Sequence, residues 1–173
     1  MKGTFYKLLA AALISLFVSD NTFAQGRAPI VTDSIFTHRD AERIIGQSSD
    51  LTESKTTIKA DVKTYQSAYK ASNADDRTGK TGNIYYMIEQ FNDEMSAHLS
   101  YYDIKKANEK SGIKNINHLG NEAYFHTDNE NFYFIMVRKK NVTIRMKVNR
   151  ITSRTSREAF DQVAREIVDK IKV

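Results

Sequence analysis

The chain has 173 residues, with 26 Lys and Arg against 21 Asp and Glu, and a formal net charge of +5. It has no cysteine, which excludes disulfides, thiol catalysis and cysteine-ligated metal centres. This length suits one domain that buries roughly two-thirds of its unfolded surface and holds together through its core alone.

The first 24 residues have the pattern of a cleavable secretory signal. Lys2 and Lys7 supply a positive start, an uncharged apolar run follows at 8–18, and Ala24 is small enough for signal peptidase. The alternative is a membrane anchor, but a helix of these 11 residues would rise only about 16 Å against roughly 30 Å of hydrocarbon core. We therefore expect a signal peptide at 1–24 and a product without a stable membrane anchor, either secreted or periplasmic.

Removal of this leader would leave 24 basic and 20 acidic residues, a formal charge of +4. Residues 25–35 contain the only proline and show no lasting period, so we expect a linker or flexible arm there. The remainder, 36–173, is predicted to form a single domain.

The domain is predicted to open with a short helix. Thr37 is suited to the N-cap with Asp40 three residues on, and Gly46 can end the helix in the left-handed conformation. Residues 55–71 then alternate as a strand does, with one face formed by Tyr65, Ser67, Tyr69 and Ala71.

A loop rich in turn formers, 73–83, follows, and we expect Gly79 and Gly82 to take positive φ there. The next segment, Ile84–Ile88, is apolar on both faces. That pattern is typical of a central strand in a sheet that is covered on both sides, or at least on one side with a partner on the other.

A helix is predicted from a cap at Asn92 or Asp93 to about Lys110, ended by Gly112. It has two apolar stripes, one formed by Met95, Leu99 and Tyr102 and the other by Ala97, Tyr101 and Ile104. Our interpretation is that the helix is wedged between the sheet and a loop. The alternative is an exposed aromatic docking surface.

Three more strands are predicted at 123–126, 132–137 and 142–148, the last with one buried and one solvated face. Thr155 with Glu158 matches a capping box for a final helix. Its apolar face comprises Phe160, Val163, Ala164, Ile167 and Ile171. The fold class is therefore α+β, an antiparallel sheet of about five to six strands flanked by helices.

No catalytic or cofactor motif is supported. Residues 74–81 match a relaxed phosphate-loop pattern, but a strand follows them where such a loop requires a helix. His126 lies near Asp128 and Glu130, a weak metal-site pattern that an exposed turn explains as well. There is no nucleophile elbow, although carboxylates paired in space for glycoside hydrolysis stay open as an alternative. We expect no metal, no cofactor and no enzymatic activity.

Basic residues are concentrated between Glu130 and Glu158, where there is no acidic residue. The candidates for partner binding are Arg138, Lys139, Lys140, Arg145, Lys147 and Arg150. Such a cluster attracts polyanions, and outside the cytoplasm an anionic envelope polymer, a lipid headgroup or an acidic protein is a better partner than nucleic acid. The alternative is that these residues only keep an outer strand soluble.

Tyrosine is the other enriched residue type. A cleft for a small ligand could be lined by Tyr65, Tyr69, Tyr101 and Tyr102, although packing on sheet and helix faces explains them as well.

The segments 119–125 (LGNEAYF), 137–141 (VRKKN) and 40–46 (DAERIIG) resemble those of small secreted bacterial proteins and lipoproteins of unassigned function. These have a PsbP-like α-β-α sandwich, so the resemblance implies an antiparallel sheet between helices. The chain differs in having Asn121 where Asp is frequent, Lys140 where Gly is frequent, and no cysteine for lipid attachment. The resemblance implies a scaffold and transfers no functional residue.

Taken together, these features predict a secreted, non-catalytic domain that binds a protein or anionic polymer of the bacterial envelope. A small-ligand carrier with a tyrosine-lined cleft is the first alternative, and an envelope hydrolase is the second.

Overall fold

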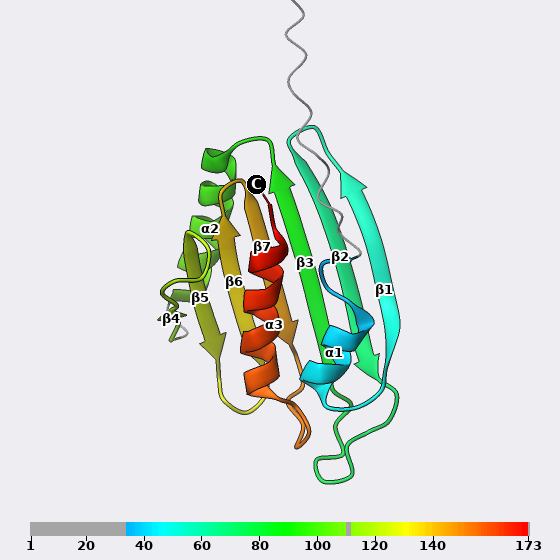
Figure 1. Ribbon diagram of the computed structural model, residues 1–173. Helices are drawn as coiled ribbons and strands as arrows, with labels where there is room; N and C mark the ends of the chain where they lie inside the picture. The colour runs from blue at the N-terminus through cyan, green and yellow to red at the C-terminus, as the bar shows by residue number, and fades with distance from the viewer. Residues whose placement is uncertain (1–33, 110–111, 173) are drawn as a thin grey trace, which may run out of the picture.

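A computed structural model describes residues 34–109 and 112–172 as one antiparallel sheet with helices on both of its faces (Figure 1). The signal peptide and most of the arm predicted from the sequence lie outside the described residues. The helices are α1 (His38–Ile45), α2 (Glu94–Asn108) and α3 (Arg157–Lys170). The strands are β1 (Ser49–Ile58), β2 (Val62–Ala71), β3 (Asn83–Phe91), β4 (Lys114–Asn115), β5 (Glu122–Thr127), β6 (Tyr133–Lys139) and β7 (Val142–Val148).

The seven strands have the order β1-β2-β3-β7-β6-β5-β4, and every neighbouring pair is antiparallel. The predicted α+β class is confirmed, but the strand count is higher than the predicted five to six. The segment 55–71 is in fact the end of one strand and the whole of the next, joined by a tight turn in which Lys59 N donates to Val62 O. Because almost every residue of β1 is exposed, this strand lacks the alternation that identifies its neighbours.

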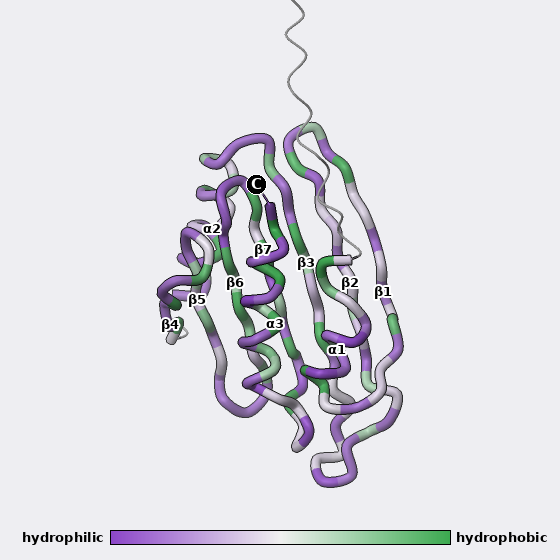
Figure 2. The backbone as a smooth tube through the Cα atoms, in the orientation of Figure 1, coloured by the Kyte–Doolittle hydropathy of each residue, from purple (hydrophilic) through white to green (hydrophobic). Residues whose placement is uncertain are grey.

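The main core lies between the sheet and the layer formed by α1 and α3, which are in front of the sheet in Figure 1. Alternate residues of the central strands point into it, including Ile84, Tyr86 and Ile88 of β3. The predicted apolar face of α3 is buried as expected. In Figure 2 the edge strand β1 is mostly pale or purple, which fits its lack of buried side chains.

Local signals at α1 are confirmed. Thr37 and Asp40 form a capping box, and Gly46 closes the helix at φ 78°. A Cβ at Gly46 would lie 2.1 Å from the carbonyl oxygen of Arg154, so this close approach of two chain segments also requires glycine. Ile35, which the sequence places in a flexible arm, is buried in the core.

The cap of α3 differs from the prediction. Ser156, rather than Thr155, is the N-cap and accepts from Ala159 N. The hydroxyl of Thr155 instead accepts from Thr152 N at 2.9 Å and stabilises the turn before the helix.

The loop between β2 and β3 is fixed by Asp75, which is 1% exposed. Its carboxylate accepts from Thr78 N at 2.8 Å and from Ser153 Oγ at 2.7 Å, which attaches the loop to the segment before α3. Gly79 has the expected positive φ of 65°, whereas Gly82 does not, so that part of the prediction is wrong.

The second layer of helix consists of α2 alone, which packs on the opposite face of the sheet. Its N-cap is Asp93, one of the two predicted residues, and it buries Ala97 and Tyr101. Tyr101 packs with Tyr124 and Met136 in a smaller core cluster.

The other stripe of α2 contradicts the interpretation that the helix is wedged between the sheet and a loop. Met95, Leu99 and Tyr102 are 65%, 53% and 51% exposed. The sequence could not distinguish the stripes, since both have apolar residues at helical spacing.

Candidate binding surface on the open face of the sheet

The face of the sheet that carries α2 is only partly covered. Seven strands spaced roughly 4.8 Å apart are about 29 Å across, whereas one helix is about 10 Å wide. Because α2 packs on β6, β7 and β3, no helix of the described residues covers β1 and β2 on this side. We call the uncovered part of this face, over β1, β2, β3 and the end of β7, the open face.

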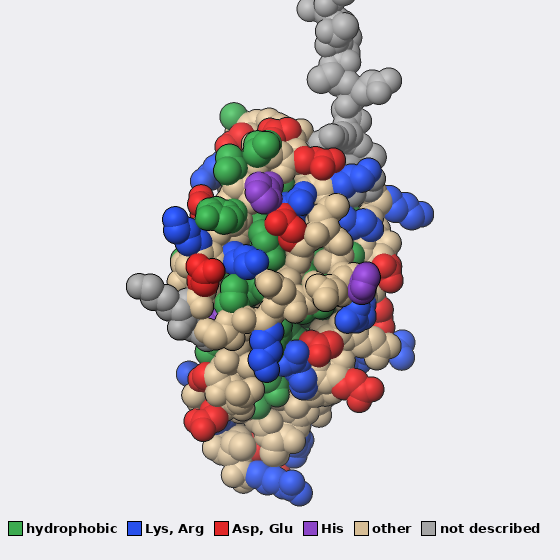
Figure 3. All heavy atoms as spheres, turned by 90° about the vertical axis from the view of Figure 1, so that its left-hand side faces the viewer, with side chains coloured by type: hydrophobic (Ala, Val, Ile, Leu, Met, Phe, Trp, Pro, Cys, Tyr) green, Lys and Arg blue, Asp and Glu red, His purple; other side chains and the backbone are tan. Residues whose placement is uncertain are grey.

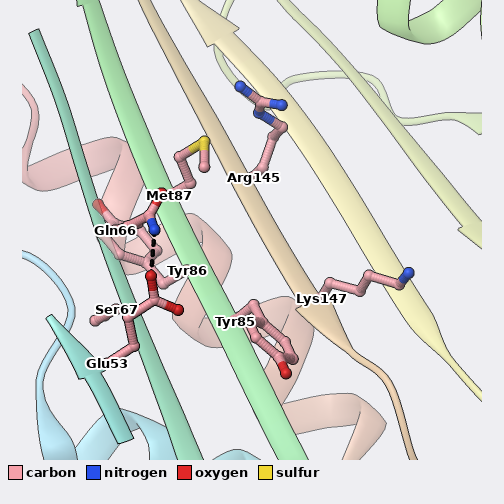
Figure 4. Close-up of a pocket in the computed structure, with 8 residues that line it drawn as sticks. All are labelled: Glu53, Gln66, Ser67, Tyr85, Tyr86, Met87, Arg145 and Lys147. Atoms are coloured by element: carbon pink, nitrogen blue, oxygen red, sulfur yellow. Dashed lines mark hydrogen bonds between the residues drawn. The ribbon is translucent and has the colours of Figure 1, made fainter. Parts of the chain in front are cut away.

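The open face contains a shallow hollow of about 200 Å³ across four strands (Figure 4). It is lined by Glu53, Gln66, Ser67, Tyr85, Tyr86, Met87, Arg145 and Lys147. The register explains how they meet: Tyr85 of β3 lies directly opposite Lys147 of β7, and Met87 lies opposite Arg145.

The floor of the hollow is apolar, and it lies on β3, an interior strand of the sheet. Tyr85 is 42% exposed and Met87 is half-buried, whereas Ala68, directly across from Tyr85 on β2, is buried. Cover by this chain on both sides of β3 is therefore not observed, whereas the other form of the prediction, cover on one side and a partner on the other, stays a prediction. A large apolar side chain left uncovered at such a position favours a binding surface.

The two basic side chains at the rim of the hollow differ in their ion pairing with the described residues. The guanidinium of Arg145 donates to the carboxylate of Glu89, which also accepts from Thr143 Oγ1 at 3.0 Å. Arg145 Nε is buried and has no hydrogen-bond acceptor within the described part of the chain. Lys147 is exposed, forms no ion pair with any described residue, and holds its ammonium 5.7 Å from the ring centroid of Phe132.

Two further lysines lie on the open face. Lys55 is directly opposite Gln66 in the sheet, and Lys70 is opposite Asn83, so both share the face of Met87 and Tyr85. The one acidic side chain at the hollow, Glu53, accepts a hydrogen bond from the amide of Gln66. Asp50 lies directly opposite Lys70 on the same face. With Arg145 neutralised by Glu89, three lysines therefore stand against the two carboxylates of Glu53 and Asp50, and the open face has a net charge of +1 among the described residues.

The six basic residues predicted as one cluster are separated by the fold. Arg145 and Lys147 lie at the hollow, whereas Arg138 is under α2, where it donates to the carboxylate of Glu122. Lys139 is on the opposite face and donates from Nζ to the carbonyl oxygens of Val168 and Ile171, at 2.9 and 2.8 Å.

The last two of the six lie outside the strands. Lys140 is in the hairpin turn with φ 50°, and Arg150 is exposed after the end of β7. Alternation along a strand separates side chains that are neighbours in sequence, which explains why the run of basic residues does not form one patch.

The four tyrosines predicted to line a cleft lie on different sides of the sheet. Tyr65 and Tyr69 are buried on the side of α1, where burial raises the pKa of Tyr69. Tyr101 packs edge-on against Tyr124 at 5.7 Å on the side of α2, and Tyr102 is exposed. These four side chains therefore do not line a common cleft.

Titratable groups near α2 form a structural cluster. Glu122 accepts from Arg138 and pairs with His98 Nδ1 at 3.0 Å. Burial acts to raise the pKa of Glu122, but the hydrogen bonds from His98 and Arg138 outweigh it and hold the pKa below its ordinary value. The cluster attaches the start of α2 to the strands beneath.

Asp128, proposed as a partner of His126, instead stabilises the turn after β5. It accepts from the backbone N–H of Glu130, Asn131 and Phe132, and these bonds, with Asn131 the strongest contributor, hold its pKa well below the ordinary value. Within 34–109 and 112–172, no three His, Asp or Glu residues are grouped so that they could hold a metal ion.

A second, more polar hollow of about 430 Å³ lies beside the end of α3. Two of its basic residues have structural contacts, because Lys139 binds the carbonyls of α3 and the backbone of Lys140 donates to Asn121 Oδ1 at 2.6 Å. We regard it as the weaker candidate, since these groups already hold a turn and a helix end.

Six of the eight lining residues were not assigned to a site from the sequence: Glu53, Gln66, Ser67, Tyr85, Tyr86 and Met87. The sequence contained one signal of an open face, because the three predicted helices are too few to cover both faces of a wide sheet. The pattern within 84–88 could not show which face stays open.

The chain matches no protein-family model, no curated protein and no solved structure. Among the helices that the structure describes, none has the length and apolar character needed to cross a bilayer.

Proposed function

We propose that the protein is a non-catalytic binding module of the bacterial extracytoplasmic space, and that its open face binds an acidic segment of another protein. The observation that carries the proposal is the exposed Tyr85 with the half-buried Met87 on β3, beside Lys147, which forms no ion pair with any described residue.

The chemistry of the open face favours a partner with both apolar and acidic side chains. Tyr85 and Met87 offer apolar area that is removed from water only when a partner covers it. Lys55, Lys70 and Lys147 offer ammonium groups to carboxylates. A polyanion without apolar groups would use the lysines alone.

The dimensions of the hollow favour an extended partner over a small ligand. Small-molecule sites typically have volumes of about 300–1,000 Å³ and bury most of the ligand. The hollow has about 200 Å³ and is open along the sheet, so it supports docking across its surface rather than enclosure. The alternative function, a small-ligand carrier, is less well supported, because the four predicted tyrosines do not form a cleft.

The compartment is inferred from the sequence of residues 1–24 alone, because the structure does not describe these residues. The resemblance to PsbP-like secreted proteins implies layers of helix, sheet and helix. The arrangement of this chain supports the resemblance, which we include in the proposal.

Binding to model polymers tests the proposal. The purified protein is titrated into fluorescein-labelled poly(Glu,Tyr), poly-Glu and polyphosphate, and anisotropy is measured. We expect the Glu–Tyr copolymer to bind most tightly, and added salt to weaken its binding. Lys147→Glu should weaken it about tenfold or more, since one attraction becomes a repulsion.

Lys114→Glu is the matched control, because Lys114 is an exposed lysine on β4 at the far edge of the sheet. Equal weakening by the two variants would reduce the effect to net charge and contradict a role for the open face. Binding of polyphosphate as tight as that of the copolymer would favour a plain polyanion site.

A further inference from the structure

The helix α2 is apolar on two opposite faces, and only one of them is used within the described chain. Ala97 and Tyr101 are buried against the sheet, whereas Met95, Leu99 and Tyr102 are more than half exposed. Figure 3 shows hydrophobic side chains gathered at its upper left, on the side of the molecule where α2 lies, which is behind the sheet in Figure 1. A helix that is apolar on both faces is typically covered on both.

The outer stripe has the spacing of a helix–helix seam. Met95, Leu99, Tyr102 and Lys106 are separated by four, three and four residues, which is the a/d repeat of a coiled coil. We call these four residues the α2 seam. At about 100° per residue the seam points directly away from the buried face of α2. Such a narrow ridge fits the groove of another helix better than a flat surface.

We propose that the α2 seam is a self-association surface, on which α2 of a second copy of this chain packs antiparallel. In this register Leu99 of each copy faces Tyr102 of the other, and Met95 faces the aliphatic stem of Lys106. The contact is isologous, so a two-fold axis closes it as a dimer.

Charge favours the antiparallel direction. The first turn of α2 contains the acidic Glu94 and the last turn contains Lys105 and Lys106. Antiparallel packing places the basic end of one helix beside the acidic end of the other and opposes the two helix dipoles. A parallel pair would bring Lys106 next to Lys106 of the second copy.

The free edge of β1 is a less suitable place for a second copy. A register shift between Leu51 and Glu53 interrupts the regular strand, and Lys55 adds charge to the edge. Bulges and lysines are features by which edge strands avoid pairing with another chain.

Oligomeric state tests the proposal directly. One helix per copy gives a small interface, below about 1,200 Å² in total, so dimers are expected at micromolar concentrations and above. Sedimentation velocity over a concentration series should show a monomer–dimer equilibrium, and Leu99→Glu should raise the dissociation constant about tenfold or more.

Leu51→Glu is the matched control, because Leu51 on β1 is also 53% exposed. It should leave the dissociation constant within about twofold, since surface changes outside an interface have small effects. A wild-type protein that stays monomeric at about millimolar concentration would overturn the proposal. So would a dimer that Leu51→Glu disrupts and Leu99→Glu does not.

Cross-linking tests the direction of the helices, and the absence of native cysteine makes single-cysteine variants specific. In the antiparallel register Met95 and its equivalent are about 16 Å apart along the axis, whereas Leu99 and its equivalent are about 4 Å apart along it. A short bismaleimide should therefore cross-link Leu99→Cys and not Met95→Cys. Efficient cross-linking of Met95→Cys would instead indicate parallel helices and contradict the proposed packing.

Discussion

Asp75 shows how one buried carboxylate can hold together segments that are far apart in sequence. Its side chain accepts from Ser153 Oγ on one side and from the N–H and hydroxyl of Thr78 on the other. The hydrogen bond from Ser153 contributes most to lowering the pKa of Asp75 to about 2, together with the bonds from Thr78 and against an opposing effect of burial.

This lowered pKa predicts an acid-dependent stability. Because the pKa in the folded state is below its ordinary value of 3.8, the stabilising contribution is complete above about pH 4 and is lost as the pH falls toward 2. Asp75→Asn should lower the urea midpoint at pH 7, measured by circular dichroism, and the difference from wild type should shrink between pH 4 and 2.

The neighbouring Asp76 provides the control, since its side chain is 88% exposed and, among the described residues, pairs with Arg154 alone at the surface. Asp76→Asn should change the midpoint little at any pH. A constant difference between wild type and Asp75→Asn down to pH 2 would show that the carboxylate does not titrate as described.

At the scale of elements, the two faces of α2 predict opposite responses to truncation. Tyr101→Ala removes a ring packed against Tyr124 and should cost about 3 kcal/mol of unfolding free energy. Tyr102→Ala removes an exposed ring that contacts Lys106, and should cost under about 1 kcal/mol. Chemical denaturation measures both, and similar losses from the two variants would contradict the orientation of α2.

Elements with strong local signals were predictable from the sequence. The capping box at Thr37 with Asp40, the stop at Gly46 and the alternation of β2 depend on residues a few positions apart. The position of β1 was predicted only in part. Its side chains are exposed on both faces, so burial does not produce an alternation of apolar and polar residues along this strand.

The candidate site was harder to predict because it depends on which strands become neighbours. Lys147 was predicted as a basic partner residue, but its position beside Tyr85 follows from the pairing of β3 with β7, which are separated by more than 50 residues in the chain. Likewise, the sequence contains both stripes of α2, and only the packing of Tyr101 on Tyr124 determines which one is buried.

At the scale of the whole molecule, the described part of the chain places two helices on one face of a wide sheet and one on the other. Because the second face has fewer described helices, none of them covers β1 and β2 there, and Tyr85 is exposed beside the lysines of the open face. The same face carries α2, whose outer seam is also uncovered. Both proposed contacts, one for an acidic protein segment and one for a second copy, arise from this unequal covering.

An NMR titration of the isotopically labelled protein with poly(Glu,Tyr) tests the central claim most directly. We predict that amide and methyl shifts change around Gln66, Tyr85, Met87 and Lys147, and that these changes fade as salt is added. Little change is expected in the main core or at the hollow beside α3. Shifts confined to the residues around His118 and Arg165, or an absence of shifts at the open face under saturating polymer, would contradict the account.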